Sequence, residues 1–419
     1  MLQLNILREK SEWVKERLKI KNFNGDELVD RILQLDEERK KLQLAFDNNQ
    51  ATVNSHSKLI GRKMAAGEKA EAEKLKQEVA ELKPKLMEFT SNLEQTEKLL
   101  QEVLVQLPNL PDEKVPPGKS PEENQLIRQG GSIPQLPENA LPHWELVKQY
   151  QLIDFDLGTK ITGSGFPVYI GKGALLQRRL INYFLEFNTA AGYTEYLPPL
   201  LVNAGSAYAT GQLPDKEGQM YHATEDDFYL IPTAEVPLTN IFRGELLKTE
   251  DLPVKMTGYT PCFRREAGSY GKDVRGLNRL HQFDKVEIVQ IVEPEKSSAT
   301  LEEMVAHVEQ LLINLELPYR ILRLCGGDMG FASAITYDFE VYSAAQQKWL
   351  EVSSVSNFDT FQSNRMKLRF KDAAGKNRLP HTLNGSSLAL PRIVACLLEN
   401  NQHEDGIHLP AVLGDLIIS

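Results

Sequence analysis

The stretch CFRREAGSYGKDVRGLNRLHQFDKVE, residues 262–287, combines two strand-like ends with a polar middle. Apolar residues alternate with others across 259–263, and alternation returns across 281–287. Period-two patterning on both sides of a polar insert predicts two antiparallel strands joined by a long loop.

The insert is rich in basic residues and glycines. They are Arg264, Arg265, Lys272, Arg275 and Arg279, with Gly268, Gly271 and Gly276. Guanidinium groups present rigid forks of donors that suit phosphate oxygens, and glycines let the backbone approach a ligand closely. The pattern predicts a phosphate-binding hairpin, while a solvated basic hairpin is the alternative that the spacing leaves open.

The wording FRREAGSYG followed by RGLNRLHQF resembles motif 2 of class II aminoacyl-tRNA synthetases, in the form seen in seryl-tRNA synthetases of the bacterial and organellar type. The resemblance covers nearly the whole chain and is strongest over 231–290. It implies an α+β fold whose catalytic core is an antiparallel β-sheet flanked by helices, with an N-terminal antiparallel α-helical coiled-coil arm.

Composition narrows the possible classes of protein. A length of 419 residues predicts two domains, and a net charge of −10 argues against broad nonspecific nucleic-acid binding without excluding a local basic surface. No run of eighteen apolar residues occurs and the N-terminus lacks a signal peptide's apolar core, so we expect no membrane association and a cytoplasmic protein. Cys262, Cys325 and Cys396 show no metal-ligand spacing and are expected to be reduced and packed.

The N-terminal third has heptad spacing. From Leu28 the apolar positions step by three and four residues, and after a turn at 65–67 the same stepping runs from Leu75 to Val103. Two such helices of similar length predict an antiparallel coiled-coil hairpin, which could serve dimerisation or spacing. The resemblance instead implies an arm that grips the long variable region of the serine tRNA. Basic residues near its tip that could meet phosphates are Lys58, Arg62, Lys63, Lys69, Lys74 and Lys76.

Three domain segments follow. We expect an N-terminal tRNA-binding domain at 1–108, a linker at 109–140 and a catalytic domain at 141–419. The linker is dense in proline and glycine and is predicted to run as extended chain rather than as helix or sheet. A helix over 172–192 and a strand-like segment with Pro199 resemble motif 1, which implies a homodimer interface.

The serine pocket is expected around the segment IPTAEVPLTN, residues 231–240. Thr233 and Glu235 are one residue apart, so on extended backbone they project to the same side, where a hydroxyl and a carboxylate can hold an ammonium group. The resemblance implies that L-serine contacts Thr233, Ala234, Glu235, Arg264, Glu287 and Ser386.

The nucleotide site follows from the resemblance as well. It implies that Arg264 and Arg392 are catalytic, with Arg264 on the α-phosphate and Arg392 on the γ-phosphate. The full set implied for ATP is Arg264, Arg265, Glu266, Leu280, His281, Gln282, Phe283, Glu351, Val352, Ser353, Ser354 and Arg392. Glu266 would accept from the adenine amino group, although a structural ion pair is the alternative for this carboxylate, and Phe283 would stack on the ring. Mg²⁺ would be held by Glu351 and Ser354.

The segment HTLNGSSLALPRIVACLLENNQ, residues 381–402, resembles motif 3, with Arg392 at the strand-to-helix junction. Ser387 and Pro391 stand where the commoner family pattern has glycines. Proline is acceptable in the first turn of a helix, so Arg392 is expected to keep its place.

The resemblance implies an enzyme that activates L-serine with ATP and transfers it to the 3′-terminal adenosine of the serine tRNA, with Lys272 and Arg275 of the insert as further tRNA contacts. The selenocysteine tRNA is an additional candidate acceptor. Two alternatives remain: a synthetase-like enzyme that charges a carrier protein, and an inactive synthetase-like scaffold. The complete arm disfavours the first. The second is disfavoured by an intact set of implied site residues, namely Thr233, Glu235, Arg264, Glu287, Glu351, Ser354 and Arg392.

Overall fold

The computed structural model describes residues 1–215, 218–266, 275–414 and 416–419. Lys272, one of the expected tRNA contacts, lies outside the described residues. The chain divides into two compact units, one formed by Met1–Lys19 and Phe23–Pro108 and the other by Ile20–Asn22 and Asn109–Ser419. Within the described ranges, no helix has both the length and the hydrophobicity needed to cross a lipid bilayer.

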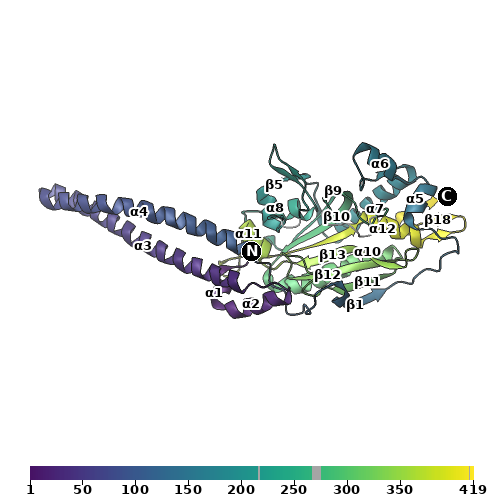
Figure 1. Cartoon of the computed structure of the whole chain (residues 1–419), viewed down its shortest axis with the longest axis horizontal. Helices are drawn as coiled ribbons and strands as arrows, with labels where there is room; N and C mark the ends of the chain where they lie inside the picture. Colours follow the sequence, from purple (N-terminus) through teal and green to yellow (C-terminus); the bar gives the residue numbers. More distant parts are fainter. Residues whose placement is uncertain (216–217, 267–274, 415) are drawn as a thin grey trace. The chain divides into compact units, whose positions relative to one another are not determined.

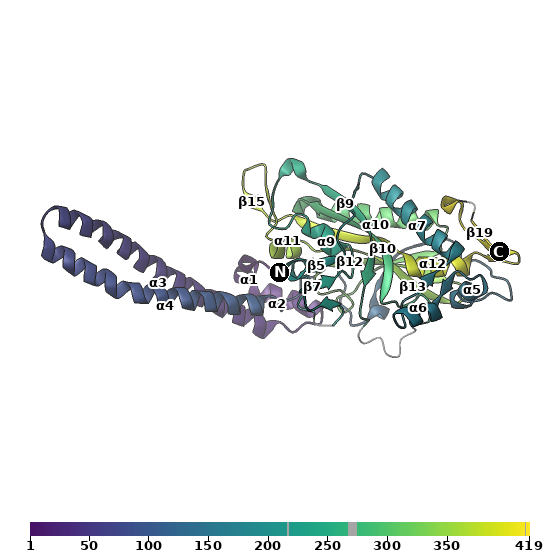
Figure 2. The same cartoon turned by 90° about the horizontal axis from the view of Figure 1, so that it is seen from above.

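The first unit is helical. Its elements are α1 (Leu4–Glu9), α2 (Ser11–Ile20), α3 (Asp26–Ala65) and α4 (Lys69–Leu104). The long helices α3 and α4 lie side by side along the arm (Figure 2) and are joined by a tight turn at Gly67, whose φ is +82°. At 1.5 Å per residue each helix is roughly 55–60 Å long. The prediction of a coiled-coil hairpin is confirmed.

The base of this arm holds most of its buried contacts. Val14 and Leu18 of α2 and Ile32 of α3 are fully buried there. Arg8 donates two hydrogen bonds, of 2.6 and 2.7 Å, to the buried carboxylate of Asp36. The hydrogen bond from Arg8 lowers the pKa of Asp36 to about 2 against the opposing effect of burial. The short helices α1 and α2 therefore anchor the start of α3.

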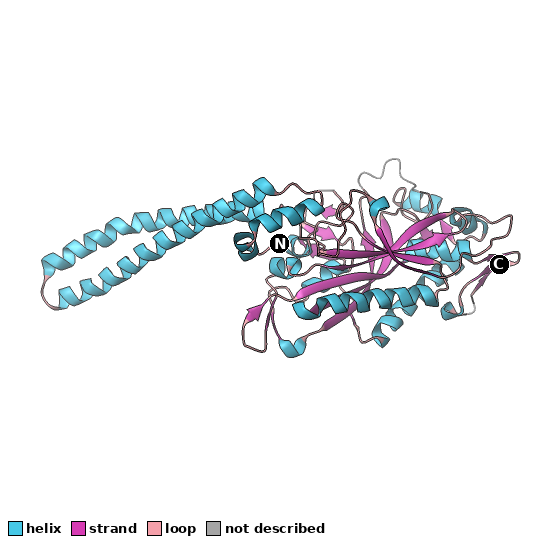
Figure 3. Ribbon diagram, turned by 90° about the horizontal axis from the view of Figure 1, so that it is seen from below, coloured by secondary structure: helices cyan, strands magenta, loops and turns pink. Residues whose placement is uncertain are grey.

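The second unit is built on an eight-stranded sheet, drawn in magenta in Figure 3. Its strand order is β1-β11-β12-β13-β16-β10-β9-β4, and every pairing is antiparallel except that of β4 with β9. The strands are β1 (Gln125–Gly130), β4 (Thr194–Glu195), β9 (Val254–Phe263), β10 (Gln282–Val292), β11 (Tyr319–Arg323), β12 (Ile335–Ser343), β13 (Lys348–Asn357) and β16 (His381–Ala389). The two strands expected around the basic insert are β9 and β10, so that prediction is confirmed.

The two faces of the sheet differ in character. Three long helices pack on one face (Figure 1), and they are α7 (Gly171–Ala190), α10 (Ser297–Asn314) and α12 (Leu390–Asn400). Val286 and Ile288 of β10 point into the core beneath these helices and are fully buried. Lys285 and Glu287 alternate with them and point to the opposite face. One face therefore carries the main core, and the other is free to carry polar groups.

Shorter elements surround this sheet. They are α5 (His143–Gln149), α6 (Phe155–Ile161), α8 (Ala204–Thr210), α9 (Glu235–Asn240), α11 (Phe361–Met366), β2 (Ile153–Asp154), β3 (Val168–Tyr169), β5 (Leu201–Asn203), β6 (His222–Ala223), β7 (Phe228–Leu230), β8 (Leu246–Lys248), β14 (Arg369–Lys371), β15 (Asn377–Arg378), β17 (Gln402–His403), β18 (Gly406–His408) and β19 (Ile417–Ile418). Single turns of 3₁₀ helix occur at Pro121–Glu123, Thr249–Asp251, Pro294–Lys296 and Ala411–Leu413.

One expectation about the linker is wrong. The segment 109–140 was predicted to contain neither helix nor sheet, but Gln125–Gly130 forms β1 and pairs with β11 at the edge of the main sheet. The edge of β11 would otherwise expose unpaired backbone groups, and β1 satisfies them. By contrast, the expected helix over 172–192 is present as α7, and Cys262, Cys325 and Cys396 are free and buried.

Candidate active site

A cavity of about 1020 Å³ opens on the polar face of the sheet. Its walls come from β10, β12, β13 and β16, from the start of α12, and from the loop between β9 and β10. On β10 the cavity is lined by Phe283, Lys285 and Glu287, which are two residues apart and share one face of the strand. The alternation that predicted this strand also determines which of its side chains reach the cavity.

Glu287 is held by two neighbours inside the cavity. The Thr233 hydroxyl donates to Glu287 Oε2 at 2.8 Å, and Lys285 Nζ lies 2.8 Å from the same oxygen. All three side chains are buried. Ser386 lies opposite Glu287 in the register of β10 with β16 and also lines the cavity. Four polar groups thus converge on a space suited to a small polar ligand.

Glu235 joins this group by a different route from the one predicted. Thr233 and Glu235 were expected on extended backbone, but Glu235 is the first residue of α9, and its N–H donates to Thr233 Oγ1 at 3.2 Å. Its Oε1 accepts from Gln362 Nε2 at 2.6 Å. The helix turn, rather than strand alternation, brings the hydroxyl and the carboxylate together.

The electrostatic state of Glu235 is unusual. Burial, followed by the nearby charge of Glu287, raises the pKa of Glu235 to about 7, while the hydrogen bond from Gln362 and the charge of Lys285 oppose that rise. Burial and Glu287 thus disfavour the charged form of this carboxyl group. A cation that enters the pocket would stabilise that charged form. An ammonium group on the ligand meets that requirement.

The two arginines predicted to be catalytic line the same cavity. The Arg264 guanidinium lies 5.2 Å from the ring centroid of Phe283, and the backbone N–H of Arg264 donates to His281 O at 2.9 Å. Arg392 donates from Nη1 to Glu351 O at 2.6 Å and from Nε to Asn278 O at 3.3 Å. Residues 128 positions apart in the sequence therefore face one ligand-sized space.

The structure accommodates Ser387 and Pro391, the two residues that depart from the commoner motif 3 pattern. Pro391 lies in the first turn of α12, where a missing N–H breaks no intrahelical bond, so the prediction for Pro391 is confirmed. The Ser387 hydroxyl donates to Asn188 Oδ1 at 2.8 Å. The same oxygen accepts from His307 Nε2 at 2.7 Å, and Asn188 Nδ2 donates to Thr257 Oγ1 at 2.9 Å. A buried asparagine on α7 thus satisfies the additional hydroxyl.

Glu266 forms an ion pair in this structure, and its expected role at the adenine amino group stays a prediction. Arg279 Nη1 donates to Glu266 Oε2 at 2.9 Å, and Glu266 has a left-handed φ of +50°. Both residues line the cavity. The partner is Arg279 rather than Arg264, so this pair leaves the Arg264 guanidinium over Phe283.

Hard oxygen donors gather at one wall of the cavity. Ser354 Oγ lies 3.4 Å from Glu351 Oε1. Asp338 lies opposite Ser354 in the register of β12 with β13. Burial, followed by the charge of Glu351, raises the pKa of Asp338 well above its usual range. Asp338 Oδ1 is buried and lacks a hydrogen-bond partner in the described part of the chain. Carboxylate and hydroxyl oxygens with spare acceptor capacity fit Mg²⁺, whose remaining ligands usually come from phosphates and water.

Four residues implied for the site are absent from the described lining of the cavity. These are Ala234, Arg265, His281 and Gln282. Ala234 is fully buried in a separate apolar cluster, and Gln282 is paired with Phe263 at the start of β10. The His281 ring stacks on the Phe166 ring, with 5.4 Å between the ring centroids. His281 Nδ1 and the Tyr221 hydroxyl form a hydrogen bond of 2.9 Å. The remaining implied serine, ATP and metal residues all line the cavity.

Other cavity residues were missed by sequence reasoning. They include Lys285, Asn384 and Asp338. The sequence did contain a signal for Lys285. It lies two residues from both Phe283 and Glu287, so strand alternation places all three on the same face. Gln362 contacts Glu235 from 127 residues away, and no local pattern reveals that contact.

The basic residues expected near the arm tip differ in their pairing. Lys63 forms ion pairs with Glu68 and Glu71, and Lys76 pairs with Glu73 at 3.1 Å. Lys58, Arg62, Lys69 and Lys74 have exposed side chains. In the second unit, the Arg275 guanidinium lies 6.0 Å from the centroid of the Trp144 ring.

Comparisons with known proteins find relatives over the whole chain. Residues 1–111 match the family described as "Seryl-tRNA synthetase N-terminal domain", and residues 219–401 match "tRNA synthetase class II core domain (G, H, P, S and T)". The chain is 48% identical over 415 residues to a serine–tRNA ligase of Salinibacter ruber, covering 99% of this chain and 97% of that one. It is 46% identical over 407 residues to a serine–tRNA ligase of Methylacidiphilum infernorum, with 97% and 96% covered.

A solved structure is similar over the same extent. The seryl-tRNA synthetase of Pyrococcus horikoshii complexed with ATP has a TM-score of 0.92 and 32% identity to this chain, with 99% of this chain and 97% of that one covered. The similarity therefore spans both units and the sheet that carries the cavity.

Proposed function

The chain belongs to the seryl-tRNA synthetase family, and from that membership we propose how its residues carry out the reaction. It is a serine–tRNA ligase, an ATP-dependent and AMP-forming enzyme. L-serine and ATP form seryl-adenylate and pyrophosphate, and serine then passes to the 3′-terminal adenosine of the serine tRNA.

In the first step the serine carboxylate attacks the α-phosphorus of ATP. A bond forms from a carboxylate oxygen to that phosphorus, and the bond to the β-phosphate oxygen breaks as pyrophosphate leaves. Such a displacement depends on alignment and on neutralisation of negative charge more than on covalent help from the protein. Arg264 supplies the positive charge at the α-phosphate, and Phe283, 5.2 Å from it, offers a ring face to the adenine.

Serine recognition rests on the buried polar groups around Glu287. Glu235 and Thr233 bind the substrate ammonium, while Glu287 and Ser386 surround the substrate hydroxyl. Alanine would leave these buried groups without a partner, and a site of this kind can discriminate strongly without editing. The contacts of Gln362 with Glu235 and of Lys285 with Glu287 hold the two carboxylates in place.

The triphosphate end lies at the opposite wall in this proposal. Arg392 binds the γ-phosphate, since its guanidinium is oriented by Glu351 O and Asn278 O and lines the cavity. Glu351 and Ser354 would hold Mg²⁺, with Asp338 beside them. The bound ion would neutralise charge on the phosphates and fix their conformation.

The helical unit serves the second substrate. We assign residues 1–108 to tRNA binding, 109–140 to the connecting segment and 141–419 to catalysis. Exposed Lys58, Arg62, Lys69 and Lys74 present positive charge near the tip of the arm, and Lys63 and Lys76 do so beside acidic neighbours. Arg275 and the rest of the loop between β9 and β10, including Lys272, would meet the acceptor end.

Assembly and location complete the proposal. The chain forms a homodimer through the segment around Pro199, where Leu197 is 85% exposed and Leu201 is 48% exposed. It works in the cytoplasm, since three free buried cysteines suit a reducing compartment.

The observation that carries these assignments is that Arg264, Arg392 and the Thr233–Glu287 pair face one cavity. The test is serine-dependent exchange of labelled pyrophosphate into ATP, followed by charging of purified serine tRNA. Arg264→Ala should abolish exchange, whereas Arg378→Ala, at a half-exposed arginine paired with Glu295, should not. Wild-type exchange without charging of serine tRNA would instead support charging of another acceptor, such as a carrier protein. Full exchange by Arg264→Ala would overturn its assignment.

A further inference from the structure

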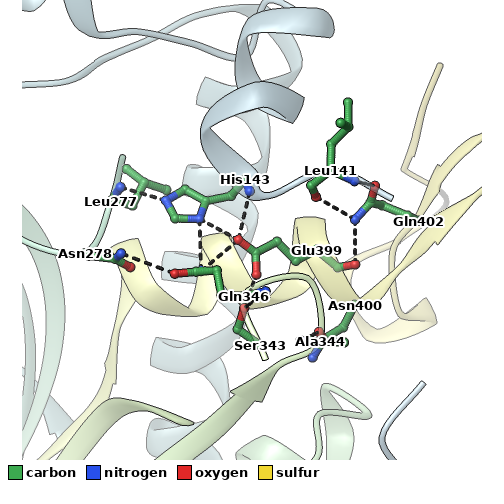
Figure 4. Close-up of polar contacts among 10 residues, drawn as sticks. All are labelled: Leu141, His143, Leu277, Asn278, Ser343, Ala344, Gln346, Glu399, Asn400 and Gln402. Carbon is green, nitrogen blue, oxygen red and sulfur yellow. Dashed lines mark hydrogen bonds and ion pairs between the residues drawn. The ribbon is translucent and has the colours of Figure 1, made fainter. Parts of the chain in front are cut away.

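A fully buried carboxylate, Glu399, joins three segments of the second unit. Its Oε1 accepts from the backbone N–H of His143 at 2.8 Å, from His143 Nδ1 at 2.6 Å and from Gln346 Nε2 at 2.8 Å (Figure 4). Its Oε2 accepts from the hydroxyl of Ser343. A buried carboxylate is stable only when its oxygens accept such bonds. Glu399 on α12 thus fixes both the start of α5 and the turn after β12.

The opposite side of the His143 ring contacts the loop between β9 and β10. The backbone N–H of Leu277 donates to His143 Nε2 at 2.9 Å (Figure 4). A backbone N–H can only donate, so Nε2 carries the lone pair and the ring proton is on Nδ1, directed at Glu399. His143 therefore acts as donor to α12 and acceptor from the loop at the same time.

The loop approaches this ring very closely. Gly276 has a φ of +60°, and a Cβ added there would lie 2.2 Å from His143 Nε2. Only glycine permits both the left-handed backbone and this approach. Arg275 packs 6.0 Å from the ring centroid of Trp144, the next residue of α5. Two consecutive residues of α5 thus hold the described C-terminal end of the loop.

The same piece of loop orients a cavity arginine. Asn278 O accepts from Arg392 Nε at 3.3 Å, and Asn278 Nδ2 donates to Gln346 Oε1 at 3.3 Å. Arg392 lies in the first turn of α12, and Glu399 lies in the last. The contacts therefore run from the end of α12 through His143, Leu277 and Asn278 back to its beginning.

We propose that His143 is a positioning residue for ATP binding. By accepting from Leu277 N–H while anchored to Glu399, it fixes the Asn278 carbonyl that orients Arg392 toward the triphosphate. This inference rests on the proposed role of Arg392. The competing explanation is that the His143–Glu399 pair only secures α5 to α12.

Two substitutions at residue 143 separate these explanations. His143→Asn places an amide nitrogen near the position of Nδ1, so donation to Glu399 can persist, but it has no acceptor at the Nε2 position. His143→Gln reaches the Nε2 position and can accept from Leu277 N–H, but it has no donor at the Nδ1 position. The proposal expects His143→Asn to raise the KM for ATP in pyrophosphate exchange about tenfold, as loss of one hydrogen bond would. The KM for serine should change less than about twofold, and His143→Gln should lie closer to wild type.

A binding cycle tests the route through Arg392. The dissociation constant for ATP is measured by calorimetry for the full-length wild type, His143→Asn, Arg392→Ala and the double variant. The proposal expects His143→Asn to weaken ATP binding about tenfold in the wild-type background and to have little further effect when Arg392 is absent. Additive losses would overturn it. An unchanged KM for ATP in His143→Asn would also overturn it. Equal changes in the KM values for ATP and for serine, together with a lowered melting temperature in both His143→Asn and His143→Gln, would overturn it as well.

Failure of the proposed function has a different signature. If Arg392 does not bind ATP, Arg392→Ala alone leaves the dissociation constant unchanged, whatever His143 does. If Arg392→Ala weakens binding but His143→Asn does not, only the positioning role is wrong.

Discussion

The Thr233 hydroxyl donates to Glu287 Oε2 at 2.8 Å in a pocket where both side chains are buried. Lys285 Nζ lies 2.8 Å from the same oxygen. The carboxylate is therefore held by two groups and keeps acceptor capacity for the hydroxyl of a substrate. This arrangement supports the proposal that Glu287 helps to recognise serine.

Glu287→Gln should damage serine binding selectively. The amide keeps the size of the side chain but loses the charge that Lys285 and Thr233 stabilise. We expect the KM for serine in pyrophosphate exchange to rise roughly 10- to 100-fold, because a buried polar site is left mispaired. The KM for ATP should stay within about twofold of wild type. Glu250→Gln, at a side chain 72% exposed, is the matched control. An equal rise in both constants would contradict this role.

The raised pKa of Glu235 predicts a pH dependence of stability. Its pKa is about 7 in the folded chain against an ordinary value of 4.5, because of burial and then Glu287. The folded state binds this proton more tightly than the unfolded state does. The resulting contribution to the free energy of unfolding is therefore complete below pH 4.5 and is lost as the pH rises through about 7. The loss amounts to roughly 3 kcal/mol. Urea unfolding at several pH values should show this slope in wild type relative to Glu235→Gln; parallel curves would contradict it.

The same group should make serine binding depend on pH. The substrate ammonium prefers the carboxylate form of Glu235, so serine affinity should rise by up to about tenfold per pH unit as the pH approaches 7 from below, and then level off. Calorimetric titration with serine between pH 5.5 and 8.5 measures this. In Glu235→Gln the affinity should be low and nearly independent of pH. A Gln variant with the wild-type pH profile would assign the titration to another group.

Glu351→Gln should increase the magnesium requirement. The substitution removes one charge from the predicted ligand set, and Ser354→Ala removes a weaker neutral ligand. We expect the Mg²⁺ concentration for half-maximal exchange to rise about tenfold in Glu351→Gln and less in Ser354→Ala. The substitution weakens the ion pair of Arg392 Nη1 with Glu351 Oε2 at 3.7 Å. Arg392 keeps its hydrogen bonds to the backbone oxygens of residues 351 and 278, so its orientation should survive the change. An unchanged magnesium midpoint would argue against Glu351 as a ligand.

Charge removal near the arm tip should affect tRNA and spare the chemistry. Combining Lys58→Ala, Arg62→Ala and Lys74→Ala removes three exposed charges. The KM for tRNA should rise roughly tenfold, and charging should depend less steeply on salt, because fewer phosphates are neutralised. Pyrophosphate exchange should be unchanged.

The same arm offers a matched control for that experiment. The triple change Lys83→Ala, Lys85→Ala and Lys98→Ala removes the same charge from exposed positions farther along α4. Equal tRNA defects in the two triple variants would show that total charge matters rather than the tip.

Asn188 should matter more for stability than Ser387. Ser387→Gly removes one hydrogen bond and costs about 1 kcal/mol. Asn188→Ala removes the hydrogen-bond partner that Ser387, His307 and Thr257 share. It should lower the free energy of unfolding by about 2–3 kcal/mol. Denaturant unfolding measures both values. A larger loss from Ser387→Gly than from Asn188→Ala would contradict the central place of the asparagine.

Much of the fold could be predicted because its patterns are local. Heptad spacing predicts α3 and α4, and period-two alternation predicts β9 and β10 together with the face on which Phe283 and Glu287 lie. The strand β1 was missed, since Gln125–Gly130 has no strong alternation and is ordered by pairing with β11. The turn at Thr233–Glu235 was misassigned, because the start of α9 depends on its packing as well as on its sequence.

By itself the sequence determined which residues are available, how they alternate along each helix and strand, and to which family they belong, since these properties depend on neighbours a few positions apart. Only the tertiary structure decided that Gln362 reaches Glu235, that Glu266 pairs with Arg279, and that His143 lies between Glu399 and Leu277. Most of these contacts join segments more than a hundred residues apart. They form because burial of the shared core brings the segments together, and each buried polar group must then find its partner where packing has placed it.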